Sequence, residues 1–392
     1  MLNNTIRGGY SESINMLRFP LAILVVFVHS FGTDIDVAEL HANGLTGLVA
    51  YDYIRLFFSV VIARSAVPIF FIISGFLLFV KVEEYNKTVY ISKLRKRLYS
   101  LVIPYFSWIL LLVLWTLVFK VGGILLHGKS WTGILEYFQE NGYLHMLWDC
   151  SVWEERTTWL GIETHNSGPI LLPFWYMRDL IMMVVISQAI YWLIKKAKII
   201  FLILLLAIYV FDIRVSWMSG TFTCASLFFS LGAYFAIMKQ DFTDVLRKWK
   251  MVIWPVAVIL MVCQTYTGSA MGDEASRMIH PWLVIFQSFA LIQLASFLCK
   301  YRKLYEINKK LSKASFFIYA LHPFILGYVI SAFNKIEILV DKATPVSDSW
   351  YLMTFNYLAS PFVCILLCIV IYWFLQKYLP SFLGVIVGER KK

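Results

Sequence analysis

The stretch INMLRFPLAILVVFVHSF, residues 14–31, indicates the fold class of this chain. It is apolar enough and long enough to cross a bilayer as one helix, yet Arg18 stands near one end and His29 near the other. Eleven residues separate the two, which places them within roughly 20° of one helix face and ~16 Å apart along the axis. They share a face without touching each other.

A charged side chain inside a span costs roughly 2.5–3.5 kcal/mol, so we expect Arg18 and His29 to face a protein interior or a wet cavity. One passage with a cation near one mouth and a proton acceptor near the other fits this spacing. The alternative is passive: Arg18 snorkels to the lipid headgroups, and His29 rests at the interface.

Composition indicates an integral membrane protein. Of the 392 residues, 60% are hydrophobic, 17% aromatic and only 15% charged, and the mean hydropathy is +0.70. The sequence predicts an all-α polytopic membrane protein whose residues 1–392 form a single membrane-embedded domain, with an outer loop at about residues 122–173. Ten spans are predicted, the fifth of them short: residues 14–31, 65–82, 100–121, 174–194, 199–213, 221–238, 250–267, 281–299, 314–334 and 353–378.

Positive charge is distributed unevenly between the loops. Alternate loops hold 24 and nine Lys and Arg residues, while Arg18 and Arg178 lie inside spans. The positive-inside rule therefore places both termini in the cytoplasm, and this distribution argues against nucleic-acid binding as the reason for the net charge of +11. The first apolar run has no small-residue cleavage site after it, so we expect it to be retained as a span.

The cysteines give no disulfide framework or metal-binding spacing. Five of the six fall in predicted spans, and only Cys150 lies in an outer loop. The sequence also has no Gly-rich phosphate loop, no His-Glu-x-x-His motif and no Gly-x-Ser-x-Gly motif. We therefore expect no metal cofactor.

A basic segment, Lys93, Arg95, Lys96 and Arg97, precedes the third predicted span. Such a cluster is typical of a topogenic patch beside lipid headgroups. The alternative function is a cradle for a polyanionic cytoplasmic ligand.

Two later spans also carry ionisable residues. Arg178 and Asp179 lie one turn inside the outer end of the fourth span, and neighbouring side chains on a helix point ~100° apart, so they need not pair with each other. A functional site and a buried structural ion pair both fit them. His322, next to Pro323 in the ninth span, is either a packing residue or part of a site. The outer loop holds four tryptophans suited to the membrane interface or to the apolar faces of a sugar: Trp131, Trp148, Trp153 and Trp159.

Four segments, in this order and spacing, resemble the acyltransferase 3 family of bacterial membrane acyltransferases over essentially the whole chain. They are Arg18-x10-His29, VPIFFIISGFLLF at 67–79, FWYMRDLI at 174–181 and SFFIYALHP at 315–323. The resemblance implies transfer of an acyl group, most often acetyl from acetyl-CoA, to a hydroxyl of a surface glycan or its lipid-linked precursor. It implies a location in the bacterial cytoplasmic membrane, and the form expected is the one without the extracellular esterase-like domain.

The resemblance also implies residue roles. His29 matches the essential family histidine and Arg18 its companion. Arg97 matches the first of two arginines that family members often carry three apart, whereas the second position here is Ser100. A histidine of pKa ~6.5 suits removal of a proton from a sugar hydroxyl, and Arg178 lies at a similar depth as a donor to the developing oxyanion. We therefore expect His29, Arg178 and Asp179 at the catalytic centre. The residues expected to bind acyl-CoA are Arg18, Lys93, Arg95, Lys96, Arg97 and His322.

A secondary transporter of a lipid-linked sugar or small anion is the rival hypothesis. Intramembrane charges and Pro-interrupted helices also mark transporters. The sequence shows no convincing two-fold internal repeat, which argues against this class.

Overall fold

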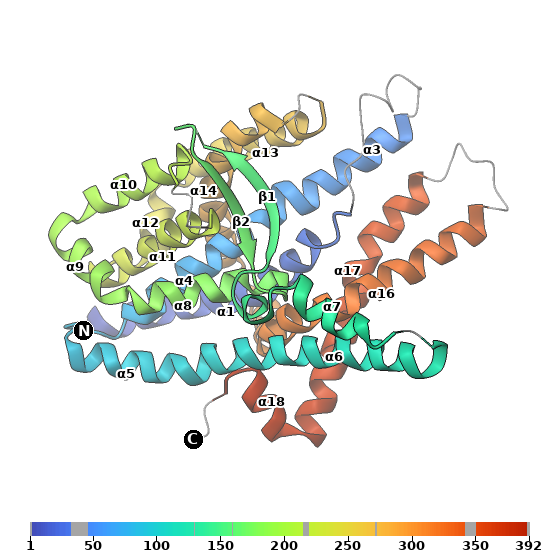
Figure 1. Ribbon diagram of the computed structural model, residues 1–392. Helices are drawn as coiled ribbons and strands as arrows, with labels where there is room; N and C mark the ends of the chain where they lie inside the picture. The colour runs from blue at the N-terminus through green and yellow to red at the C-terminus, as the bar shows by residue number, and fades with distance from the viewer. Residues whose placement is uncertain are drawn as a thin grey trace. The chain divides into compact units, whose positions relative to one another are not determined.

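The computed structural model describes residues 2–32, 46–128, 130–158, 160–214, 219–270, 273–341 and 350–389. Within them the chain is almost entirely helical, as the sequence predicts (Figure 1). The helices are α1 (Leu2–Val28), α3 (Thr46–Arg55), α4 (Ala66–Phe79), α5 (Lys87–Arg97), α6 (Ile103–His127), α7 (Thr132–Glu140), α8 (Trp175–Val185), α9 (Ser187–Ala197), α10 (Ile199–Val210), α11 (Thr221–Ile237), α12 (Phe242–Lys248), α13 (Lys250–Ala270), α14 (Asp273–Leu298), α15 (Arg302–Leu311), α16 (Ser315–Asp341), α17 (Trp350–Tyr378) and α18 (Pro380–Ile386).

Shorter elements join the helices. Two segments are π-helical, Leu56–Ile62 and Leu98–Val102. Four are 3-10 turns, Ala63–Ser65, Tyr143–Leu147, Leu172–Phe174 and Ser312–Ala314. Single-turn π segments inside helices are found frequently at functional sites.

Seven helical stretches in the described residues are long and apolar enough to cross a membrane, or nine if each of two bent helix pairs is one span. The seven are Tyr10–Val28, Gly47–Phe79, Lys87–His127, Lys250–Gly268, Ala275–Leu298, Arg302–Glu337 and Trp350–Tyr378. The bent pairs are Leu172–Val185 with Ser187–Ala197, and Thr221–Ile237 with Phe242–Lys248. The fifth predicted span corresponds to the shorter apolar helix α10, so each of the ten predicted stretches has a helix, and the count of ten is approximate.

The second of these stretches begins earlier than the predicted span at 65–82. It starts at Gly47 and so takes in Asp52, Arg55 and Arg64, which are loop residues in the sequence-based topology. Arg55 Nε donates to Asp52 Oδ1 at 2.8 Å, and both side chains are 3% exposed. Because Asp52 and Arg55 neutralise each other, both can lie buried in the apolar helical stretch.

The bend between α8 and α9, 63°, is held by side-chain hydrogen bonds at its corner. Ser187 Oγ, fully buried, contacts the carbonyl oxygen of Val184 at 2.7 Å and the hydroxyl of Tyr85 at 2.9 Å. Gln188 Nε2 donates to the backbone carbonyl of Tyr85 at 3.0 Å. The Ser187 hydroxyl thus satisfies the Val184 carbonyl at the bend, and the two bonds to Tyr85 tie the corner to the segment before α5.

Two compact units make up the chain: Met1–Ile73 with Met238–Trp373, and Ser74–Ile237 with Phe374–Lys392. In the first unit α1 packs against α14, α15, α16 and the π-helical segment Leu56–Ile62, and its core residues Leu21, Ala22 and Val26 are at most 1% exposed. In the second unit, α4 meets α11 at Gly75. A Cβ at Gly75 would lie 2.0 Å from the carbonyl oxygen of Phe229, so only glycine permits this approach.

The loop predicted to lie on the outer side contains a β-hairpin for which no strand was predicted. Strands β1 (Ser151–Thr157) and β2 (Glu163–Gly168) pair antiparallel, with a bulge between Val152 and Glu154 (Figure 1). Gly161, at φ +73°, forms the turn, which requires a positive φ. A Cβ at Gly168 would lie 3.1 Å from Trp175, so glycine lets the hairpin pack close to that residue; the rings of Trp175 and of Trp153, on β1, have centroids 6.3 Å apart.

Candidate functional site

His29 lies in the turn directly after α1, and several side chains secure this turn. The last carbonyls of a helix have no partner within the helix. Here Ser30 Oγ donates to the carbonyl of Val26 at 2.8 Å, and Ser59 Oγ donates to the carbonyl of Phe27. Ser59 comes from the π-helical segment Leu56–Ile62, so this irregular turn fixes the end of α1 just before His29.

Arg55 secures the chain on the other side of His29. Its Nη1 donates to the carbonyl of Phe31 at 3.1 Å, and its guanidinium carbon lies 4.2 Å from the centre of the Phe31 ring. Arg64, in the following 3-10 turn, lies within electrostatic range of His29. Hydropathy places Arg55 and Arg64 in a loop, and nothing in the sequence signals that they lie near His29, because they are distant from the first span along the chain.

The structure brings His29 together with His322. Their ring centroids are 5.2 Å apart and the rings are tilted by 34°. His322 is completely buried on α16, and its Nδ1 lies 3.2 Å from the carbonyl oxygen of Ile318. A carbonyl only accepts, so Nδ1 carries the proton in the neutral ring and Nε2 presents a lone pair. Nε2 is buried and has no hydrogen-bond partner among the residues described.

Arg178 and Asp179 form an ion pair in the second unit, although they are adjacent on α8. Arg178 Nε donates to Asp179 Oδ1 at 2.9 Å, and the two side chains are 3% and 1% exposed. Arg178 also donates to the Trp148 carbonyl at 3.4 Å and to Asp149 Oδ1 at 3.3 Å. The hydroxyl of Thr221 contacts Arg178 Nη2 at 3.3 Å and donates to Asp179 Oδ2. These contacts are those expected of a buried structural ion pair, which is one of the two interpretations that the sequence allows for Arg178 and Asp179.

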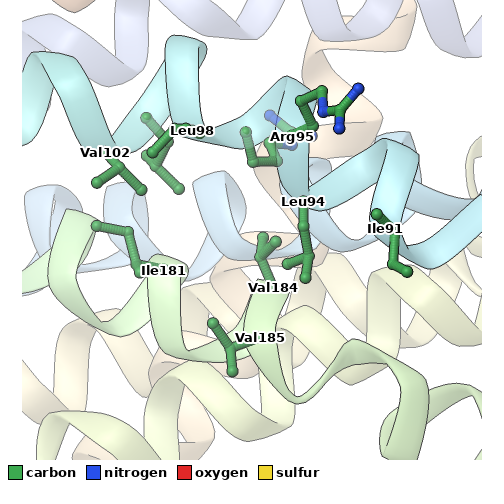
Figure 2. A pocket seen from close by; sticks show the side chains of 10 residues that line it. Ile91, Leu94, Arg95, Leu98, Val102, Ile181, Val184 and Val185 are labelled. Atoms are coloured by element: carbon green, nitrogen blue, oxygen red, sulfur yellow. The ribbon is translucent and has the colours of Figure 1, made fainter.

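The basic segment borders a pocket in the second unit. Asn86 Oδ1 caps α5, the helix that carries the cations, by accepting from Val89 N at 3.0 Å. The pocket has a volume of about 350 Å³ and is mostly apolar, with Arg95 at its edge (Figure 2). Its lining residues come from α5, the segment Leu98–Val102 and α8: Ile91, Leu94, Arg95, Arg97, Leu98, Leu101, Val102, Ile181, Val184 and Val185.

The other predicted donor-binding residues are placed differently. Lys93 is half-buried and Lys96 exposed, and neither lines the pocket. Ser100 Oγ, at the position of the second expected arginine, donates to the carbonyl of Lys96 at 3.1 Å. Arg18 is half-buried on α1, in the unit that also holds His29.

The outer-loop tryptophans do not form one group in the part of the chain that is described. Trp131 is 61% exposed, Trp148 gives its carbonyl to Arg178, and Trp153 packs near Trp175. Trp159 lies outside the described residues. Within those residues there is also no group of three His, Cys, Asp or Glu side chains arranged to hold a metal ion.

A family model described as an acyltransferase domain, Acyl_transf_3, matches residues 11–374. The match runs through both compact units and includes every candidate residue named above. No curated protein and no solved structure matches the chain.

Proposed function

Because the chain belongs to the acyltransferase 3 family, we propose that it moves an acetyl or other short acyl group from cytoplasmic acyl-CoA to a hydroxyl of a cell-surface glycan or lipid-linked saccharide. The enzyme is a multi-pass membrane acyltransferase. The proposal makes residues 1–392 one membrane-embedded domain in a bacterial cytoplasmic membrane, with both termini in the cytoplasm. The observation that carries it is the placement of His29, a secured imidazole at the end of α1 beside a second histidine.

His29 acts as the general base in this proposal. It removes the proton from the acceptor hydroxyl while the hydroxyl oxygen attacks the thioester carbonyl. The carbon–sulfur bond then breaks, and the leaving thiolate of CoA takes up the proton from His29. Thiols are acidic, with pKa ~8.5, so the leaving group needs less help than the hydroxyl does.

The donor is proposed to bind along the basic segment and the adjoining pocket. Guanidinium groups bind phosphates in a bidentate manner, and Arg95 and Arg97 both border the apolar pocket. This combination suits a molecule with anionic phosphates at one end and a long, weakly polar arm. Lys93 and Lys96 would add positive potential on the cytoplasmic side, and Arg18 would meet the donor along α1.

Arg178 enters the proposal as the donor to the developing oxyanion, with Asp179 orienting it. For this, one contact of the guanidinium must exchange for the acyl oxygen. The bonds to the Trp148 carbonyl, at 3.4 Å, and to the half-exposed Asp149, at 3.3 Å, are longer than the 2.9 Å bond to Asp179 and are the ones to exchange.

Direct transfer in a ternary complex is the proposed order. The acceptor reaches His29 from the outer side while the donor remains among the cytoplasmic cations. We place no covalent acyl-enzyme on the path.

Thiol release from acetyl-CoA by the purified protein in lipid nanodiscs, where water takes the place of the acceptor hydroxyl, tests the function. We expect release by the wild-type protein and a loss on the order of 10²–10⁴-fold in His29→Ala, with an unchanged size-exclusion profile. His127→Ala, at an exposed histidine ending α6, is the matched control and should keep the wild-type rate. Full activity of His29→Ala would show that His29 is not the general base. Uptake of a labelled saccharide into vesicles without any use of acetyl-CoA would favour a transporter.

A further inference from the structure

The unpartnered nitrogen of His322 is the starting observation. His322 is 0% exposed, its Nδ1 is used by the Ile318 carbonyl, and its Nε2 has no partner in the described parts of the chain. A buried acceptor without a partner costs ~1–3 kcal/mol, and a histidine that only packs would gain nothing from it. Nε2 of His322 therefore requires a hydrogen-bond donor that is not in place in this conformation.

The nearest ring with a donor to offer is that of His29. When two imidazoles share an N–H···N bond of ~2.9 Å, ~1.1 Å from each nitrogen to its ring centre gives ~5.1 Å between the centroids. The observed separation is 5.2 Å, with a tilt of 34° between the rings. The separation of the two rings therefore matches that of a hydrogen-bonded pair of imidazoles.

Neighbouring contacts hold both rings at this separation. Asn308 Nδ2 donates to the carbonyls of Asn15, at 3.1 Å, and Met16, at 2.6 Å, which ties α15 to α1 well below the histidines. Ser59 Oγ donates to the Phe27 carbonyl at the end of α1, and the same oxygen lies 2.7 Å from the hydroxyl of Tyr357 on α17. The first contact ties α1 to the helix that leads into α16, the second fixes the end of α1 next to His29, and α1 also packs directly against α16.

We propose that His322 is the positioning residue for His29: Nε2 of His322 accepts a hydrogen bond from the ring N–H of His29. This fixes the tautomer of His29, and its other nitrogen is left with a lone pair for the acceptor hydroxyl. The hydroxyl proton moves to that nitrogen as the oxygen–carbon bond forms and the carbon–sulfur bond breaks, and the thiolate then takes the proton. This inference rests on the proposed function and assigns His322 to the base rather than to acyl-CoA.

Two amide substitutions separate this role from packing. In His322→Gln the side-chain amide reaches the position of Nε2 and keeps an acceptor there, whereas in His322→Asn it reaches only the position of Nδ1 and keeps the bond to the Ile318 carbonyl. We expect kcat for thiol release from acetyl-CoA to fall within about tenfold in His322→Gln and on the order of 10²-fold in His322→Asn. The KM for acetyl-CoA should stay within about threefold in both, because ground-state binding of the donor is untouched.

A measurement without turnover separates this inference from the proposed function. The rate at which diethyl pyrocarbonate modifies His29, followed by mass spectrometry, should drop in His322→Asn and remain near wild type in His322→Gln. Equal or better kcat in His322→Asn than in His322→Gln overturns the inference, as does a raised KM with unchanged kcat. Wild-type protein that releases no thiol overturns the proposed function, while the modification rates still decide the role of His322.

Discussion

Replacement of Asp179 by alanine should destabilise the second unit strongly, and this tests whether the Arg178 network is structural. The substitution leaves the Arg178 guanidinium, 3% exposed, without its closest partner at 2.9 Å. Asp149 remains as a partner at 3.3 Å, but its side chain is 41% exposed and solvent screens it. The cation is then buried with little compensation.

The expected losses follow from burial and from the number of bonds removed. Removing one partner of a buried pair costs about 3–5 kcal/mol, so Asp179→Ala should lower the melting temperature by about 6–20 °C at ~2–4 °C per kcal/mol. Thr221→Val removes hydrogen bonds to both charged groups and should cost about 1.5–3 kcal/mol. Asp149→Ala removes only a screened contact and should cost about 0–1 kcal/mol.

Thermal unfolding of the purified variants in one detergent measures this order, and thiol release from acetyl-CoA is measured in parallel. The double variant Arg178→Met, Asp179→Leu removes both charges and should recover most of the lost stability. If it recovers stability and activity together, the pair is structural; if it recovers stability alone, Arg178 also acts on the substrate. A melting temperature for Asp179→Ala equal to that of the wild-type protein would refute the reasoning.

Three further outcomes are expected. Gly75→Ala should abolish the folded monomer on size exclusion, since its Cβ would lie 2.0 Å from a carbonyl oxygen of α11; Gly122→Ala, with nothing within 4 Å, should fold normally. Cys150 should react with an impermeant maleimide from outside; burial raises the pKa of its thiol, so its labelling should be slow at pH 7 and rise about tenfold per pH unit until that pKa is reached. Arg97→Ala, at the pocket, should raise the KM for acetyl-CoA more than Lys96→Ala outside it.

Each of these three expectations has an outcome that would contradict it. Normal folding of Gly75→Ala would mean that the two helices do not approach at that residue. Labelling of Cys150 only from the cytoplasmic side would reverse the proposed orientation. Equal effects of Arg97→Ala and Lys96→Ala would indicate diffuse charge rather than the pocket as the donor site.

Hydropathy predicted the helices well because a membrane span requires a long apolar run whatever its neighbours are. It failed where charged residues neutralise each other. Asp52 and Arg55 lower the local hydropathy, so their segment was predicted as a loop, yet as a 2.8 Å pair they lie buried in a helix. A scale that treats residues one at a time does not register such a pair.

The sequence identifies individual residues of the candidate site but not the contacts between them. Intramembrane charge singled out His29, His322 and Arg178, since each is expensive in lipid. Their partners were not predictable, because the contact of His29 with His322 depends on how α1 and α16 pack. The adjacency of Arg178 and Asp179 leaves their pairing open, and the long arginine side chain turns back to its neighbour.

The contacts in the first unit also restrict the membrane topology. Asn308 contacts Asn15, and His322 contacts His29. In both stretches the second residue comes fourteen positions after the first, so α1 and the α15–α16 stretch run parallel. Parallel spans require an odd number of crossings between them. The seven-helix count places four crossings there and the nine-span count six, whereas including α10 gives seven. If both bent pairs cross the membrane, α10 is therefore expected to cross as well, although it is only 12 residues long. Ile213→Cys should label from outside and Lys196→Cys should not; labelling of both from one side would show that α10 does not cross.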